Sequence, residues 1–124
     1  MLDLIDFLVF MNFFDRMTHL DLSYNKITSV PAKSFPSISK LEFLNLSSNS
    51  IEILESNCFD ELENLEELKL NRNRLSSFPK LIFIKMKNLK VLELNKNKFV
   101  EIPGLSFHGL KSVKILKLRR NSLR

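Results

Sequence analysis

A motif of the form L-x-x-L-x-L-x-x-N-x-L occurs five times in this chain at an unbroken period of 24 residues. The central copy runs from Leu65 to Leu75. A unit this short cannot bury a core of its own, so successive copies have to stack and share one core. The period therefore predicts a solenoid with one structural unit per repeat. The other four copies begin at Met17, Leu41, Leu89 and Val113.

Alternating leucines inside the motif predict one short strand in each repeat. Leu68 and Leu70 are separated by one residue, so they lie on the same side of an extended chain and leave Lys69 on the other side. Stacking brings these strands together as a parallel sheet with the leucines inside. We expect strands near residues 19–23, 43–47, 67–71, 91–95 and 115–119.

The part of each repeat that returns to the next strand is equally regular, with the pattern F-x-x-L-x-x-L, and its register begins at Met11 and Phe14. It is only about ten residues long, so we expect turns, extended pieces and 3₁₀ segments rather than long helices. One column is aromatic and predicts a stack of rings formed by Phe35, Phe59, Phe83 and Phe107. Another column suits a segment outside the sheet ladder, because proline has no N–H. It contains Pro31, Pro79 and Pro103, with Glu55 as the exception.

Asparagine stands at the same position in every copy of the motif. The chain has to turn out of the strand there, which leaves buried backbone groups without partners in the sheet. A side-chain amide both donates and accepts hydrogen bonds, so it can satisfy such groups. We therefore expect a structural asparagine ladder formed by Asn25, Asn49, Asn73, Asn97 and Asn121.

The repeat also defines the domain organisation. We expect residues 11–124 to form an array of about five 24-residue repeats without terminal caps, and residues 1–10 to be a degraded or non-repeat N-terminal segment. The apolar stretch 2–14 has no preceding Lys or Arg, and Asp3 and Asp6 interrupt it, which argues against a signal peptide or a transmembrane helix. An uncapped array is typical of a piece of a longer solenoid.

A search for catalytic and ligand-binding motifs finds none. Two glycines are too few for a G-x-G-x-x-G motif or a phosphate-binding loop. The single cysteine, Cys58, and the two histidines, His19 and His108, form no zinc-ligand set. We therefore predict that the chain is not an enzyme and uses no catalytic residue, cofactor or metal. One cysteine fits a cytosolic protein and, equally, the middle of a secreted repeat array.

Asn45-Leu46-Ser47 is an N-glycosylation sequon, so Asn45 is a candidate glycosylation site. The repeat itself produces this word whenever the variable strand positions are Asn and Ser, and that interpretation stays open.

Solvent-facing strand positions form the candidate interaction site. They change from nearly neutral in the first repeats to basic in the last, with apolar side chains among them. This mixture suits a protein partner with an acidic rim, and a merely solvated charged face is the alternative. A nucleic-acid groove would interleave aromatic and basic residues, whereas Tyr24 and Phe43 lie at the other end of the array. The candidate partner-binding residues on the concave face are Phe43, Glu67, Lys69, Arg72, Val91, Glu93, Lys96, Ile115, Lys117, Arg119 and Arg120.

The 24-residue pattern resembles the leucine-rich repeats of animal extracellular proteins. That resemblance implies the α/β class: a right-handed, horseshoe-shaped solenoid with a parallel sheet on its concave face and irregular or 3₁₀ segments on its convex side. Four longer words resemble the leucine-rich repeats and immunoglobulin-like domains family. These words are Leu-Asn-Leu-Ser at 44–47, Cys-Phe-Asp-Glu-Leu at 58–62, Lys-Leu-Asn-Arg-Asn-Arg at 69–74 and Gly-Leu-Ser-Phe-His-Gly-Leu at 104–110.

Members of that family are single-pass membrane proteins whose ectodomains restrain growth-factor receptor signalling. The resemblance implies a protein-interaction module that is extracellular or anchored at the plasma membrane. It implies a cell-surface receptor ectodomain as the partner, no nucleic acid, and no membrane insertion by this segment. A structural spacer whose binding domains lie elsewhere is the alternative function, and a cytoplasmic location stays open.

Overall fold

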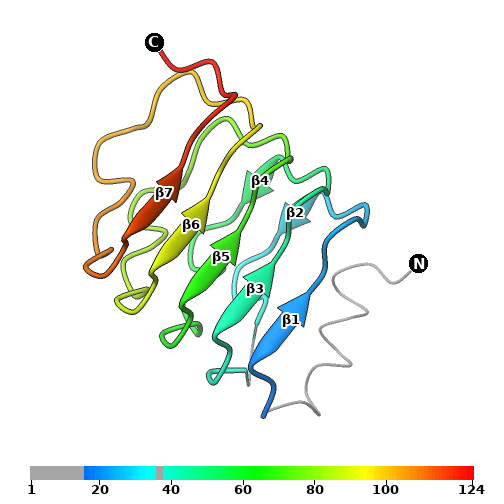
Figure 1. Ribbon diagram of the computed structural model, residues 1–124, viewed down its shortest axis with the longest axis vertical. Helices are drawn as coiled ribbons and strands as arrows, with labels where there is room; N and C mark the ends of the chain where they lie inside the picture. The colour runs from blue at the N-terminus through cyan, green and yellow to red at the C-terminus, as the bar shows by residue number, and fades with distance from the viewer. Residues whose placement is uncertain (1–15, 36–37) are drawn as a thin grey trace.

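Five parallel strands, one from each repeat, form the main sheet of the computed structural model, which describes residues 16–35 and 38–124 (Figure 1). Their order in the sheet is their order in the chain. Each residue pairs with its equivalent in the next repeat, as His19 does with Phe43 and Glu67 does with Val91. The strands are β1 (His19–Asp21), β3 (Phe43–Asn45), β5 (Glu67–Lys69), β6 (Val91–Glu93) and β7 (Ile115–Lys117).

The path of the chain is right-handed, as expected. Figure 1 shows the return segments behind the sheet while successive strands are added from right to left. Right-handed crossovers are the rule between parallel strands, because the twist of the strands favours them.

The strands begin at the predicted residues but are three residues long rather than five. Three residues beyond the end of each strand, the residue before each ladder asparagine has a positive φ, for example 58° at Arg72. This left-handed conformation turns the chain out of the strand. Hydrogen bonds between repeats nevertheless continue beyond the strands. The Leu46 N–H donates to the Lys69 carbonyl at 2.8 Å, and the Ser48 N–H donates to the Asn71 carbonyl at 3.0 Å.

Leucine columns and the aromatic stack fill the interior between the sheet and the return segments. Leu44, Leu68 and Leu92 are completely buried behind the strands. The predicted ring stack is confirmed, with centroid separations of 6.2, 6.4 and 6.3 Å along the series Phe35, Phe59, Phe83 and Phe107.

The return segments consist of consecutive turns. In the second repeat the Leu62 N–H donates to Phe59 O, and the Leu65 N–H donates to Leu62 O. Neither residues 16–35 nor residues 38–124 contain a helix, so over these ranges the α part of the expected α/β class is absent and the fold is a parallel β-solenoid. One non-glycine residue per return segment has a positive φ, which interrupts any right-handed helical run. These residues are Lys33, Asn57, Leu81 and Leu105.

A second, two-stranded sheet lies on the return side, and the sequence did not predict it. It pairs β2 (Ser29–Val30) with β4 (Ile53–Leu54). The Glu55 N–H extends this pairing by donating to Val30 O at 3.0 Å, and Glu55 Oε2 accepts the Ala32 N–H at 2.8 Å. The next repeat has Pro79 in place of Glu55, and a residue without an N–H cannot add the equivalent bond.

The register expected at Met11 and Phe14 lies outside the described residues. The division into residues 1–10 and 11–124 therefore stays a prediction.

Candidate functional site

The solvent-facing side of the five-stranded sheet is termed here the sheet face. It carries the first and third residues of each strand, because the middle residue points into the core. Since the register is constant, equivalent side chains from neighbouring repeats form rows, with strands about 4.8 Å apart. The first row contains His19, Phe43, Glu67, Val91 and Ile115, and the second contains Asp21, Asn45, Lys69, Glu93 and Lys117.

Phe43 is enclosed by its neighbours on the sheet face. The His19 ring stacks on it with 5.6 Å between the centroids. From the next repeat, Lys69 Nζ lies 5.6 Å from the centre of the Phe43 ring, within range of a cation–π interaction. At the other end of the row Ile115 is 47% exposed. The apolar surface available to a partner is therefore greater at Ile115 than at Phe43.

The lysines of the second row are engaged in ion pairs. Lys117 Nζ lies 3.0 Å from Glu93 Oε1, and Lys69 Nζ lies 4.0 Å from Glu93 Oε2. Lys69 Nζ also lies 3.9 Å from Glu67 Oε1. The Glu93 side chain is only 13% exposed, so it is held between the two lysines. The positive charge that the sequence assigns to this row is thus largely neutralised locally.

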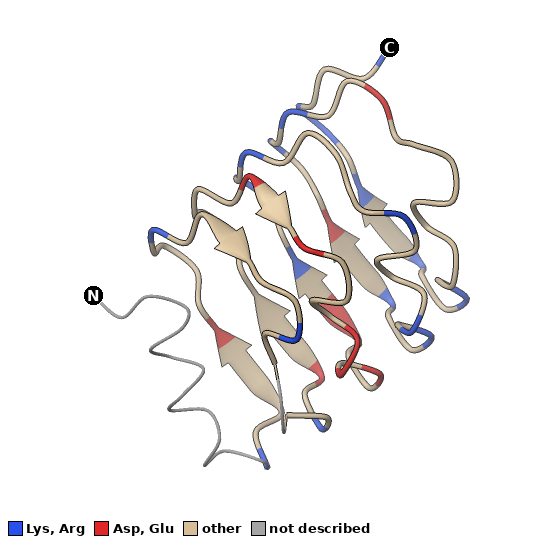
Figure 2. Cartoon of the chain, turned by 180° about the vertical axis from the view of Figure 1, so that it is seen from behind, with Lys and Arg blue, Asp and Glu red and all other residues tan. Residues whose placement is uncertain are grey.

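Unpaired positive charge lies instead at the carboxyl ends of the later strands. This group is termed here the basic corner and consists of Arg72, Lys96, Arg119 and Arg120. In the part of the chain that the structure describes, none of the four has a carboxylate oxygen within 4.0 Å. Figure 2 shows Lys and Arg gathered at the turns that follow the later strands.

The backbone holds three members of the basic corner in equivalent positions. Arg72, Lys96 and Arg120 all have φ between 56° and 58°. The N–H groups of Arg72 and Lys96 donate to the carbonyls of Asn95 and Arg119, at 2.9 Å in both cases. Desolvation lowers the pKa of Lys96, and the positive charges of Arg72 and Arg120 lower it further. The positive charges of Arg72 and Arg120 therefore repel that of Lys96.

A hollow of about 200 Å³ opens beside these side chains and is lined by Asn95, Lys96, Arg119 and Arg120. Asn95 Oδ1 accepts the Arg119 N–H at 3.2 Å, which ties two of the lining residues together across adjacent repeats.

The asparagine column forms a continuous hydrogen-bond ladder immediately behind this corner. Asn73 Nδ2 donates to Leu46 O at 2.9 Å and to Leu70 O at 3.1 Å, and Asn73 Oδ1 accepts the Ile51 N–H at 3.0 Å. The asparagines of three other repeats, Asn49, Asn97 and Asn121, each make the equivalent three contacts. In the first repeat Asn25 donates to Leu22 O. The ladder therefore fixes the turns that carry the basic corner.

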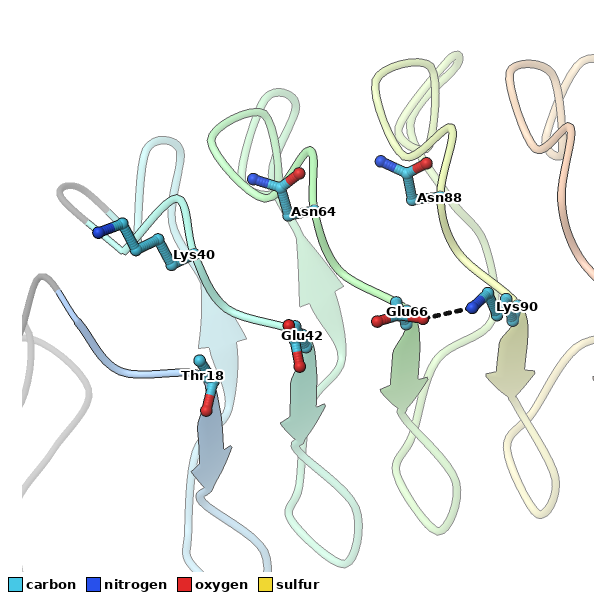
Figure 3. A pocket seen from close by; sticks show the side chains of 7 residues that line it. All are labelled: Thr18, Lys40, Glu42, Asn64, Glu66, Asn88 and Lys90. Atoms are coloured by element: carbon cyan, nitrogen blue, oxygen red, sulfur yellow. Dashed lines mark hydrogen bonds and ion pairs between the residues drawn. The ribbon is translucent and has the colours of Figure 1, made fainter.

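A second hollow lies at the amino-terminal ends of the strands, opposite the end that carries the basic corner. Its volume is about 460 Å³, and Figure 3 shows its side chains in two rows. Asn64 donates to Ser39 O at 2.7 Å and Asn88 donates to Glu63 O at 3.0 Å, so this edge has a short ladder of its own. Lys90 pairs with Glu66 at 2.5 Å. Sequence reasoning missed this groove, although the 24-residue spacing of Asn64 and Asn88 was a signal. The lining residues are Thr18, Lys40, Glu42, Asn64, Glu66, Asn88 and Lys90.

The sequon asparagine lies on the sheet face at the end of β3. Asn45 Oδ1 accepts the Ser47 N–H at 2.9 Å and the Ser47 hydroxyl at 2.6 Å. Asp21 occupies the equivalent position one repeat earlier and binds Ser23 in the same way, which lowers the pKa of its carboxyl group. The Asn45 side chain thus caps its own turn in the folded chain.

Other reactive groups are not assembled into a site. Cys58 is completely buried, and desolvation raises the pKa of its thiol. Among the described residues, no group of three or more His, Cys, Asp or Glu side chains could hold a metal ion. Over the same residues no helix has the length and apolarity to cross a bilayer.

Comparison with known proteins identifies a family for this chain. No curated protein matches this chain. The family described as Leucine rich repeat matches it twice, over residues 15–75 and 63–123, which together include all five motif copies. These matches agree with the parallel strands, the leucine core and the asparagine ladder. The chain belongs to the leucine-rich repeat family.

Proposed function

We propose that this chain is a protein-interaction module that binds a protein partner through the carboxyl-terminal half of its sheet face. The observation that carries the proposal is the positive charge of the basic corner, unpaired among the described residues, at the carboxyl end of the same β7 that exposes the apolar side chain of Ile115 at its start. A cationic group next to an apolar one is typical of interface hot spots, since charge guides association and apolar burial supplies affinity. The proposal assigns the module no catalytic role and no cofactor.

A protein partner is favoured over a nucleic acid by the position of the aromatic rings. Stacking of bases needs exposed rings between cationic groups. On the sheet face Phe43 is already covered by His19 and Lys69, and it comes from a repeat far from that of Arg120. A partner surface with acidic side chains around an apolar centre fits the basic corner and Ile115 better.

The cellular setting is proposed from the sequence resemblance alone. The words at 58–62 and 69–74 support an extracellular or membrane-anchored parent protein that regulates a growth-factor receptor, with a receptor ectodomain as the partner. In that setting Asn45 would be available for glycosylation during synthesis. A glycan there would cover the sheet face near β3 and leave the basic corner open.

Charge reversal of the basic corner tests the interaction. We expect the triple variant Arg72→Glu, Lys96→Glu, Arg120→Glu to reduce capture of the partner at least about tenfold, because each change replaces attraction by repulsion. The measurement is a pull-down with the wild-type chain to identify the partner, followed by a binding titration with each variant.

The control is a triple reversal of the same net charge on exposed residues of the return segments: Lys33→Glu, Lys85→Glu and Lys111→Glu. It should leave affinity within about twofold of wild type, since long-range effects of exposed charges are screened by salt. If this control abolished binding and the basic-corner triple did not, the sheet-face site would be wrong. If both variants bound the partner as tightly as wild type, the binding surface would lie elsewhere on the chain, and if the wild-type chain captured no partner, the structural-spacer function would be favoured.

A further inference from the structure

The basic corner differs from an ordinary charged surface because three of its four members line one hollow. Lys96, Arg119 and Arg120 all line the same 200 Å³ space, although they come from two different repeats. Desolvation lowers the pKa of Lys96, and repulsion from the positive charges of Arg72 and Arg120 lowers it further. A single group that carries negative charge on several oxygens would relieve the repulsion between Lys96 and Arg120, and it would also meet Arg119 in the same hollow.

The acidic side chains that β5 and β6 contribute to the sheet face are already paired with lysines, so they do not neutralise the cations of the hollow. Glu93, on the neighbouring strand, is held by Lys117 at 3.0 Å and by Lys69 at 4.0 Å. Glu67 lies 3.9 Å from Lys69 as well. Both carboxylates are thus already paired with lysines of the second row.

The hollow also offers a neutral donor in a fixed orientation. Because Asn95 Oδ1 accepts the Arg119 N–H, the Nδ2 group of Asn95 is left as a hydrogen-bond donor. The guanidinium groups of Arg119 and Arg120 each present a planar set of N–H donors that matches the oxygens of a phosphate or sulfate group. A carboxylate has only two oxygens and one charge, so it would leave part of this donor set unused.

We propose that the hollow lined by Asn95, Lys96, Arg119 and Arg120 binds a tetrahedral oxyanion, namely the phosphate or sulfate ester of a modified side chain on the protein partner. This inference rests on the proposed protein-interaction function and specifies its recognition chemistry. Phosphorylation or sulfation of the partner would then switch binding on. Ile115, in the strand next to the hollow, would contact an apolar side chain of the same peptide.

Three peptides that differ in one group test the proposal. They share an acidic sequence with a leucine near a central tyrosine, which is unmodified, phosphorylated or sulfated. We expect the wild-type chain to bind at least one modified peptide about tenfold or more tightly than the unmodified one, as measured by fluorescence anisotropy. The double variant Arg119→Gln, Arg120→Gln should lose that preference. The matched control Lys111→Gln, Lys114→Gln should keep it.

A pH comparison distinguishes the two esters. A phosphate monoester loses part of its charge when the pH falls from about 7.5 to about 5, across its second pKa near 6, whereas a sulfate ester does not. Affinity for the phosphorylated peptide should therefore fall over this range, and affinity for the sulfated peptide should hold. Circular dichroism of each variant verifies that it is folded.

Equal binding of all three peptides, or an unchanged preference in the Arg119→Gln, Arg120→Gln variant, would overturn the oxyanion site. The same holds if a sulfated polysaccharide binds at this corner and the modified peptides do not. These outcomes are separate from the pull-down. Loss of partner capture in the charge-reversal triple, without any preference for modified peptides, would leave the interaction function standing and remove only the oxyanion.

Discussion

Each ladder asparagine from Asn49 onward joins two consecutive repeats of the solenoid through one small side chain. Asn73 binds its own repeat at Leu70 O and the previous repeat at Leu46 O and at the Ile51 N–H. A hydroxyl group is too short and a carboxylate has no donor, so only an amide meets all three partners. The same geometry explains why the residue before it tolerates a positive φ, which otherwise costs about 1–2 kcal/mol.

Replacement of Asn73 by Ala should lower the free energy of unfolding by about 1–3 kcal/mol. Leu46 O and Leu70 O keep donors from Asn49 and Asn97, so the Ile51 N–H is the group left unpaired. Urea denaturation measures the effect. The control is Asn71→Ala, because Asn71 Oδ1 is buried without a partner and should cost little when removed. Equal losses in both variants would contradict the ladder explanation.

The two glycines of the chain predict opposite responses to alanine. Gly109 has φ of +97°, and a Cβ there would lie 2.6 Å from the Cα of Ile84, so Gly109→Ala should cost about 3 kcal/mol or more. A Cβ added at Gly104 would meet nothing within 4 Å, and Gly104→Ala should stabilise by about 0.4–1 kcal/mol through the unfolded state. Thermal unfolding of both variants decides the point, and a neutral Gly109→Ala would count against the close backbone contact.

At the scale of elements, the second sheet ends where the return column changes from Glu55 to Pro79. The β2–β4 pair is extended by Glu55, whose backbone N–H donates to Val30 O. The later repeats have Pro79 and Pro103 in this column, and they add no strand to that sheet. The return side is therefore a ribbon with one pair of strands at its amino-terminal end and consecutive turns beyond it.

Replacement of Glu55 by Pro should weaken that pair by a net of about 1 kcal/mol. The variant loses the bond to Val30 O and the carboxylate bond to the Ala32 N–H, while proline regains about 0.4–1 kcal/mol by restricting the unfolded chain. Hydrogen exchange should show faster exchange at Ala32, whereas amides of the main sheet stay protected. Unchanged exchange at Ala32 would show that Glu55 does not hold this element.

Across the whole molecule, stability depends on contacts between neighbouring repeats, because each repeat touches only the next one. The aromatic stack is the clearest case. Phe59 lies 6.2 Å from Phe35 and 6.4 Å from Phe83, so one ring joins three repeats. Phe78 adds contacts at the later end, 5.3 Å from Phe83 and 4.7 Å from Phe99.

Truncation of the central ring should therefore cost more than truncation of the last one. Phe59→Leu removes two stacked contacts from a completely buried site and should cost about 2 kcal/mol or more, whereas Phe107 is partly exposed and Phe107→Leu should cost about half as much. Denaturation midpoints of the two variants provide the measurement. A larger loss at Phe107 would contradict a nearest-neighbour account of the stack.

The sequence was sufficient for everything that depends on the 24-residue period. Strand starts, parallel register, the leucine columns and the aromatic stack follow from it, because identical units stack with identical contacts. The rows of the sheet face follow as well, since alternation along a strand determines which side a residue faces. The family match agrees with that interpretation.

Tertiary structure decided what varies between repeats. Glu93 neutralises Lys69 and Lys117, so the free charge lies at Arg119 and Arg120 rather than along the whole face. Glu55 donates a backbone hydrogen bond to the second sheet that its proline counterparts cannot donate. Asn64 and Asn88 line the second hollow and connect neighbouring repeats there. Each of these features depends on which side chain of one repeat reaches which group of the next. A period describes what the repeats share, and such contacts are made by the residues in which they differ.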